Sequence, residues 1–81
     1  MIEIDVNEKI IDLVTKHPEV KDIMASLGFG DILKPGMLQS VGRIMTIKKG
    51  ARMKEIDWNT IEDRFRENGF VLKEEELWVN L

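Results

Sequence analysis

The chain has no cysteine, only one histidine, and no apolar run long enough to cross a membrane. Without cysteine it can form no disulfide framework, no thiolate metal site and no redox thiol. A membrane-spanning helix needs roughly 18 consecutive apolar residues, and no stretch comes close. The first residues have neither the basic nor the apolar region of a signal peptide. We therefore expect a cytoplasmic protein that does not insert into a membrane.

Length and charge limit the architecture next. At 81 residues, of which 43% are hydrophobic and 33% charged, the chain has the composition of a globular domain. Area scaling predicts that folding buries about 63% of the chain's surface, enough for one small core, so residues 1–81 should form a single domain. Residues 37–54 carry five bases and no acid, although the net charge is −3. This basic middle could be neutralised by the acidic ends within the fold, or across a dimer.

Apolar spacing and capping residues predict an all-α fold, a compact bundle of about five short helices. Asn7 is the expected N-cap of the first helix. The second should begin at Pro18 and end at Gly28 in the left-handed conformation, with Phe29 folding back on it. The third should run over 37–45. Gly42 in its middle is unfavourable, which suggests a close approach of another backbone.

Two further helices complete the predicted bundle. Thr46 can cap a fourth helix that runs through Met53, and Asp57 can cap a fifth. Gly69 and Phe70 should close the fifth helix as Gly28 and Phe29 close the second.

Both ends of the chain alternate apolar and polar residues, a pattern typical of extended segments. The two stretches, 2–6 and 77–81, could pair as a small two-stranded ribbon. Residues 74–81 could equally be a last helical turn and a frayed end.

Residues that could support catalysis do not assemble into a set. His17, just before Pro18, suits a packing role, and a metal site there would need carboxylates for all its other ligands. The Ser and Thr hydroxyls lack a glycine-flanked elbow. Adjacent acids such as Glu62 and Asp63 do not face each other on a helix. We predict no enzyme activity and no bound metal or cofactor.

The basic segment offers a nucleic-acid hypothesis. Lys48, Lys49 and Arg52 share a helical face, and the turn near 54–57 would join two helices as in a helix-turn-helix. An isoelectric point near 5.1 and the Glu-rich tail argue against phosphate binding. Binding of nucleic acid is therefore the least favoured hypothesis.

The order of three motifs resembles a known family. The run from Pro18 to Phe29 is similar to the signature of the small helical family catalogued as domain of unknown function 1858. Residues 6–14 look like its first helix, and Thr46 to Ala51 followed by Ile56 and Asp57 look like its closing segment. The resemblance covers about residues 2–70. It implies a compact bacterial helical domain, related to the N-terminal domain of di-iron proteins that repair iron–sulfur clusters.

The family occurs alone or joined to PAS-type and hemerythrin-like modules. Many members carry cysteines just after the glycine that matches Gly28, but Gly30 to Leu33 contain none here. This chain therefore looks like a cysteine-free branch, and we carry over no thiol function.

The leading hypothesis is a non-catalytic interaction module. Its partner would be a larger sensory or redox protein, such as one with a PAS-type or hemerythrin-like module, or a second copy of the chain. The expected contact surface consists of Phe29, Ile32, Leu33, Pro35, Met37, Leu38 and Arg43. Alternatively, these residues simply close the core over the loop. A hypothesis from another class is a domain that binds a small ligand, metal or haem and senses redox state through His17 or a methionine.

Overall fold

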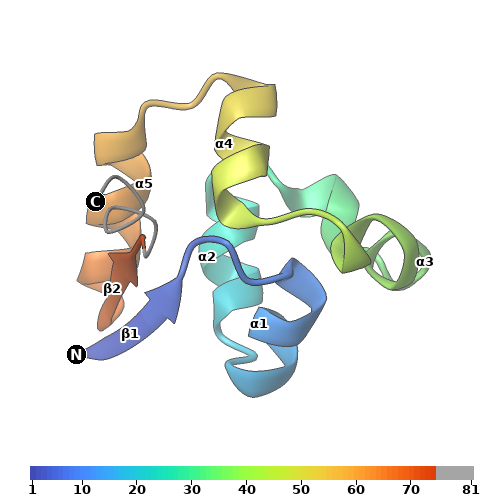
Figure 1. Cartoon of the computed structure of the whole chain (residues 1–81), viewed down its shortest axis with the longest axis horizontal. Helices are drawn as coiled ribbons and strands as arrows, with labels where there is room; N and C mark the ends of the chain where they lie inside the picture. The colour runs from blue at the N-terminus through green and yellow to red at the C-terminus, as the bar shows by residue number, and fades with distance from the viewer. Residues whose placement is uncertain (75–81) are drawn as a thin grey trace, which may run out of the picture.

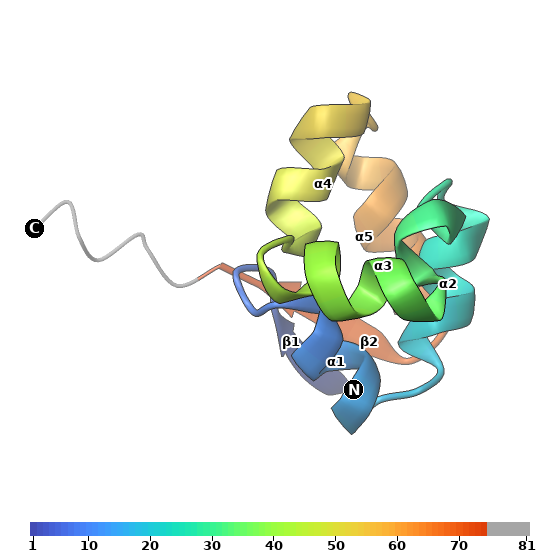
Figure 2. The same ribbon diagram turned by 90° about the vertical axis from the view of Figure 1, so that its right-hand side faces the viewer.

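The computed structural model describes residues 1–74, where the chain is mainly helical with one small sheet (Figure 1). The predicted five helices are confirmed: α1 (Ile10–Lys16), α2 (Val20–Ser26), α3 (Pro35–Ser40), α4 (Ile47–Lys54) and α5 (Trp58–Glu67). Short 3-10 segments, Gly30–Leu33 and Val41–Arg43, flank α3. The sheet contains β1 (Ile2–Asp5) and β2 (Phe70–Lys73). Seen from the side, α4 and α5 lie above the sheet, and α2 and α3 lie beside them (Figure 2).

The sheet pairs the N-terminal strand with the segment that follows α5. The strands are parallel, with Ile2 opposite Phe70 and Asp5 opposite Lys73. An extended N-terminus was predicted correctly, but the expected partner, 77–81, lies outside the described residues. The observed partner begins where Gly69, at a φ of +90°, turns the chain out of α5. The apolar run from Phe70 then continues as a strand, with the Phe70 ring buried.

The glycine ending of the second helix is confirmed. Gly28 has a φ of +101°, which an L side chain rarely adopts. The Gly28 N–H donates to the Ala25 carbonyl at 3.1 Å, and the Phe29 N–H donates to the Met24 carbonyl at 3.0 Å. These are the two hydrogen bonds of a Schellman motif. They turn the Phe29 ring back into the core, where it is 1% exposed.

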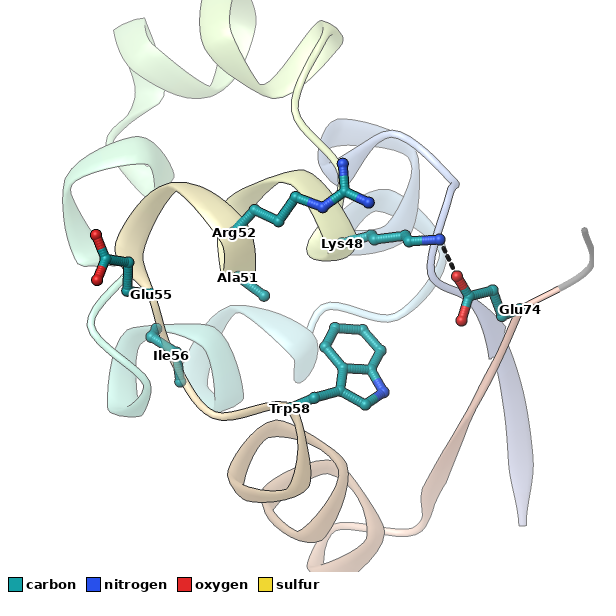
Figure 3. Close-up of a pocket in the computed structure, with 7 residues that line it drawn as sticks. All are labelled: Lys48, Ala51, Arg52, Glu55, Ile56, Trp58 and Glu74. Carbon is teal, nitrogen blue, oxygen red and sulfur yellow. Dashed lines mark hydrogen bonds and ion pairs between the residues drawn. The ribbon is translucent and has the colours of Figure 1, made fainter.

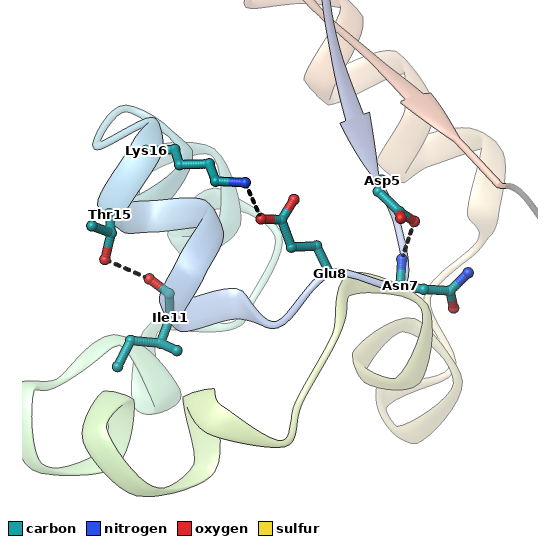
Figure 4. Close-up of polar contacts among 6 residues, drawn as sticks. All are labelled: Asp5, Asn7, Glu8, Ile11, Thr15 and Lys16. Carbon is teal, nitrogen blue, oxygen red and sulfur yellow. Dashed lines mark hydrogen bonds and ion pairs between the residues drawn. The ribbon is translucent and has the colours of Figure 1, made fainter.

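The start of α1 differs from the prediction. Its N-cap is Lys9, two residues after the expected Asn7. The Asn7 N–H instead donates to Asp5 Oδ1 at 2.8 Å, in a turn that leads out of β1 (Figure 4). The chain can turn here because the Asp5 carboxylate accepts a hydrogen bond from the Asn7 N–H, which has no partner in a helix. Antiparallel pairing of Lys9 with Thr46 then sets where α1 begins.

An ion pair lies along the outside of α1. Lys16 Nζ is 2.6 Å from Glu8 Oε2 (Figure 4). The hydrogen bond to Glu8, and then the charge of that carboxylate, raise the pKa of the exposed Lys16 ammonium. The pair joins the turn before α1 to its last turn.

The third helix also departs from the prediction. It begins two residues earlier, because Pro35 suits the first helical position, and it becomes a 3-10 segment at Val41. The close approach at Gly42 involves side chains rather than another backbone. A Cβ at Gly42 would lie 2.8 Å from Leu38 Cδ1 and 3.6 Å from Ile11 Cβ. Gly42 therefore leaves room for the buried Leu38 side chain.

Aromatic rings form the centre of the core. Phe65 and Phe70 meet edge to face, with ring centroids 6.3 Å apart. His17 packs edge-on against Phe70 at 5.5 Å. Phe29 lies against α4, where a Cβ at Gly50 would be only 2.7 Å from Phe29 Cε1. Lys54, at the end of α4, covers the same ring at 5.9 Å from its centroid. The core thereby fixes the orientation of α4.

Candidate functional site

A groove of about 380 Å³ runs beside α4, on the face turned toward the start of α5. We call it the α4 groove (Figure 3). Its lining is Lys48, Ala51, Arg52, Glu55, Ile56, Trp58 and Glu74. In the close-up, Lys48 and Glu74 stand at one end, and Glu55 and Ile56 at the other. The groove thus combines an apolar wall with charges of both signs.

The position of the groove follows from the cap and exit of α4. The Thr46 hydroxyl accepts a hydrogen bond from the Lys49 N–H at 3.0 Å, which confirms the predicted N-cap. Ile47 and Ala51 turn into the core, so Lys48 and Arg52, four residues apart, share the adjoining face. Glu55 ends α4 at a φ of +53° and turns the chain toward α5. The basic face of α4 is therefore held firmly beside the groove.

The apolar wall is provided mainly by Trp58. This residue opens α5 directly after Asp57, the predicted N-cap, whose carbonyl accepts from the Thr60 N–H at 3.1 Å. The indole is half-buried and packs against the core together with Ile56. Figure 3 shows the ring projecting along the groove toward the Lys48–Glu74 end. A tryptophan and an arginine in the lining of one groove are a combination that protein interfaces favour.

The charges of the groove are unequally paired. Lys48 forms an ion pair with Glu74, so an acid after β2 neutralises a base of the middle segment within one chain. The Arg52 side chain is exposed, and no residue within 1–74 forms a hydrogen bond or ion pair with it. The Arg52 guanidinium is therefore available to bind a carboxylate of a partner molecule.

The predicted basic patch separates into two parts. Lys48 and Arg52 both line the α4 groove. Lys49 points elsewhere, with its Nζ 3.5 Å from the Ile44 carbonyl. As predicted, a short turn joins two helices here, α4 and α5. This arrangement alone gives no evidence for binding of nucleic acid. Because Glu74 carries a carboxylate onto this face, the patch is less positive than its sequence suggests.

The predicted contact surface over 29–43 is divided by burial. Three of its side chains, Phe29, Ile32 and Leu38, are buried and close the core. Leu33 is half-buried, and Pro35, Met37 and Arg43 are exposed. Arg43 folds back onto α3, with its Nε donating to the Gln39 carbonyl at 2.7 Å. A partner at this surface could reach only the last four residues.

Four of the hydroxyl groups that could have served as nucleophiles, those of Thr15, Ser26, Ser40 and Thr46, make local hydrogen bonds instead. Thr15 donates to the Ile11 carbonyl at 2.7 Å, as Figure 4 shows, and Ser26 donates to the Ile23 carbonyl at 2.6 Å. Arg64 also donates to the Ser26 hydroxyl at 2.7 Å, which ties α5 to the end of α2. Among residues 1–74, no three His, Asp or Glu side chains gather where a metal ion could bind.

Sequence reasoning missed three parts of the groove. It gave Trp58 and Glu55 no role at a site, and it treated Glu74 only as part of the Glu-rich tail. A usable signal was present, because a tryptophan opens the helix directly after a segment rich in bases. What the sequence could not give is the return of the chain after β2, which brings Glu74 beside Lys48.

Comparison with known proteins gives one match. A family model described as "Domain of unknown function (DUF1858)" matches residues 4–61. No curated protein and no solved structure matches the chain. Within residues 1–74, no helix has the length and apolar character that a bilayer crossing requires.

Proposed function

The chain belongs to the family of domain of unknown function 1858, and from that premise we propose that it is a non-catalytic interaction module. The α4 groove binds a segment of a partner protein. The partner is a larger sensory or redox protein, such as one with a PAS-type or hemerythrin-like module, in the bacterial cytoplasm.

One observation carries this proposal: Arg52 and the half-buried Trp58 both line the same groove. Arginine and tryptophan are enriched among the residues that dominate binding energy at interfaces, tryptophan because of its large rigid ring and arginine because its planar guanidinium is preorganised for paired hydrogen bonds. The groove is also built on rigid elements. The Thr46 cap fixes one end of α4, and the Phe29 ring packs on Gly50 in its middle. A preformed surface loses little entropy on binding.

The second exposed surface is the competing site. Pro35, Met37 and Arg43 belong to it, and Met37 is 41% exposed. Its apolar side chains are scattered around α3, and its arginine already bonds to Gln39. Isolated exposed apolar residues are common on protein surfaces. We therefore place the partner in the α4 groove.

Affinity capture with matched arginine variants tests the proposal. The tagged full chain, Arg52→Gln and Arg43→Gln are each used to capture proteins from the host lysate across a salt series, with mass spectrometry as readout. Both substitutions remove one exposed guanidinium, and circular dichroism checks that both variants fold. We expect a stoichiometric partner on the parent chain and on Arg43→Gln, and its loss on Arg52→Gln.

The opposite pattern would assign the partner to the surface around α3 and overturn the groove proposal. Recovery of only the chain itself, or of nucleic acid that washes off with salt, would overturn the interaction module.

A further inference from the structure

Two exposed charges of opposite sign line the α4 groove without a partner among residues 1–74. The side chains of Arg52 and Glu55 form no hydrogen bond or ion pair with the described part of the chain. Side chains three residues apart on a helix can meet, yet these two do not pair. In Figure 3 the Arg52 side chain extends toward the Lys48 end of the groove, and the Glu55 carboxylate points the opposite way. The groove therefore has a positive end and a negative end.

The positive end carries the charge of Arg52. Lys48 and Glu74 offset each other there as an ion pair, so among residues 1–74 the uncompensated charge is that of the guanidinium. The Trp58 indole projects toward this same end (Figure 3). A carboxylate bound here would therefore meet a guanidinium beside an aromatic ring.

The negative end combines Glu55 with Ile56, which line the groove together. Ala51 lies between the two ends in Figure 3. The small side chain of Ala51 leaves space for an apolar group from outside. From one end to the other, the lining is thus positive, apolar and negative.

We propose that the α4 groove selects a partner segment that carries an acid, then an apolar residue, then a base. The acid pairs with Arg52, and the base pairs with Glu55. The apolar residue packs over Ala51, between Trp58 and Ile56. This inference rests on the proposed function and adds the chemistry of the segment that the partner supplies.

Charge complementarity favours this segment over a uniformly charged one. A wholly acidic segment would bring a carboxylate to Glu55, and a wholly basic one would bring a cation to Arg52. Like charges brought together on binding reduce affinity. A nucleic acid has the first of these defects, because its backbone is uniformly anionic. An acid lies at each end of the groove, Glu55 and Glu74, so phosphates are disfavoured along its whole length.

The length of the groove sets the size of the segment. From Lys48 to Glu55 the backbone of α4 rises about 10 Å, at about 1.5 Å per residue. Alternate residues of an extended chain face the same side and are about 6.6 Å apart, so the first, third and fifth residues span about 13 Å. A pentapeptide is therefore long enough to present all three groups to the groove.

Titration with three synthetic pentapeptides tests the inference. The mixed peptide is Glu-Ser-Leu-Ser-Lys, and two controls carry glutamate at both ends or lysine at both ends; all are acetylated and amidated. The isotope-labelled full chain is observed by NMR, with the Ala51 amide and the Trp58 indole N–H as reporters. We expect the mixed peptide to bind more tightly than either control by about fivefold, the most that one exposed ion pair contributes. High salt should remove this preference.

Charge reversal shows which residue recognises which end of the peptide. Arg52→Glu should shift the preference to the peptide with two lysines, and Glu55→Arg should shift it to the peptide with two glutamates. The double variant should prefer the mixed peptide again, bound in the opposite direction. Lys49→Glu is the matched control, because Lys49 points away from the groove, and it should leave the preference unchanged. Well-dispersed spectra confirm that each variant folds.

Equal affinity for the three peptides, no binding of any of them, or a preference that Arg52→Glu leaves unchanged would overturn the proposal. Tighter binding of a single-stranded oligodeoxynucleotide at the same reporters would also overturn it, in favour of nucleic acid. Capture of a host partner has a separate readout. A captured partner together with equal peptide affinities would refute only the chemistry inferred here, and a peptide preference without a captured partner would refute only the interaction module.

Discussion

Replacing Gly50 with alanine should destabilise the protein, although alanine is the better helix former. In a helix interior, glycine is less favourable than alanine by about 1 kcal/mol. At Gly50 the added Cβ would lie 2.7 Å from Cε1 and 3.3 Å from Cζ of Phe29, closer than such atoms approach. Because the Phe29 ring is 1% exposed, it cannot swing away into solvent. Overpacking of this kind costs about 1–3 kcal/mol.

The matched control is Gly36→Ala in α3. A Cβ at Gly36 would meet nothing within 4 Å, so only the gain in helix propensity remains. We expect Gly36→Ala to stabilise the fold by up to about 1 kcal/mol, and Gly50→Ala to destabilise it by up to about 2 kcal/mol. In a domain of this size, 1 kcal/mol shifts Tm by about 4–8 °C, so thermal unfolding followed by circular dichroism resolves the difference.

A double-mutant cycle assigns the cost to the ring. In a Phe29→Leu background, Gly50→Ala should lose most of its penalty, because the shorter side chain leaves room for the methyl group. A Gly50→Ala protein as stable as the parent, or an unchanged penalty in the Phe29→Leu background, would show that this ring does not pack on α4.

Three further predictions follow from the helix ends and from α1. Thr46→Ala should cost about 1 kcal/mol of unfolding free energy in urea, since the Lys49 N–H loses its cap, whereas Thr46→Ser should keep most of it. Gly28→Ala should cost roughly 1 kcal/mol because of the positive φ, and a Tm equal to the parent's would contradict that assignment. The pKa of Lys16 is raised by Glu8, so Glu8→Gln should lower it in an NMR titration of Lys16. The stability that this pair contributes is present below the unfolded-state pKa and lost as pH rises through the raised value; a Lys16 pKa unchanged in Glu8→Gln would refute the contact.

Local signals predicted the helices well. Apolar spacing located all five, and the glycine ending at Gly28 and the cap at Thr46 were correct because each depends on neighbouring residues alone. Asn7 failed as a cap because a contact distant in sequence, the pairing of Lys9 with Thr46, sets the start of α1. The prediction for the third helix was wrong at Gly42, which lies in a 3-10 segment and packs against the Leu38 side chain rather than against another backbone.

The site was less predictable than the fold. The bases Lys48 and Arg52 were visible as neighbours on one helical face, because helical periodicity is local. The indole of Trp58 reaches the groove through the turn at Glu55, and Glu74, the partner of Lys48, reaches it through the path of β2. Since neither is encoded by spacing within α4, the groove could be recognised only in three dimensions.

The parallel pairing of β1 and β2 links the start of the chain to the groove. Ile2 pairs with Phe70, a separation of 68 residues along the chain (from 2 to 70). Closing a loop of that length costs roughly 4 kcal/mol of chain entropy, so the strands should join late in folding and part early in local opening. Glu74 follows β2 directly, so parting of the strands would also release the rim of the groove. A change in the first strand can therefore alter binding at α4, although none of its residues lines the groove.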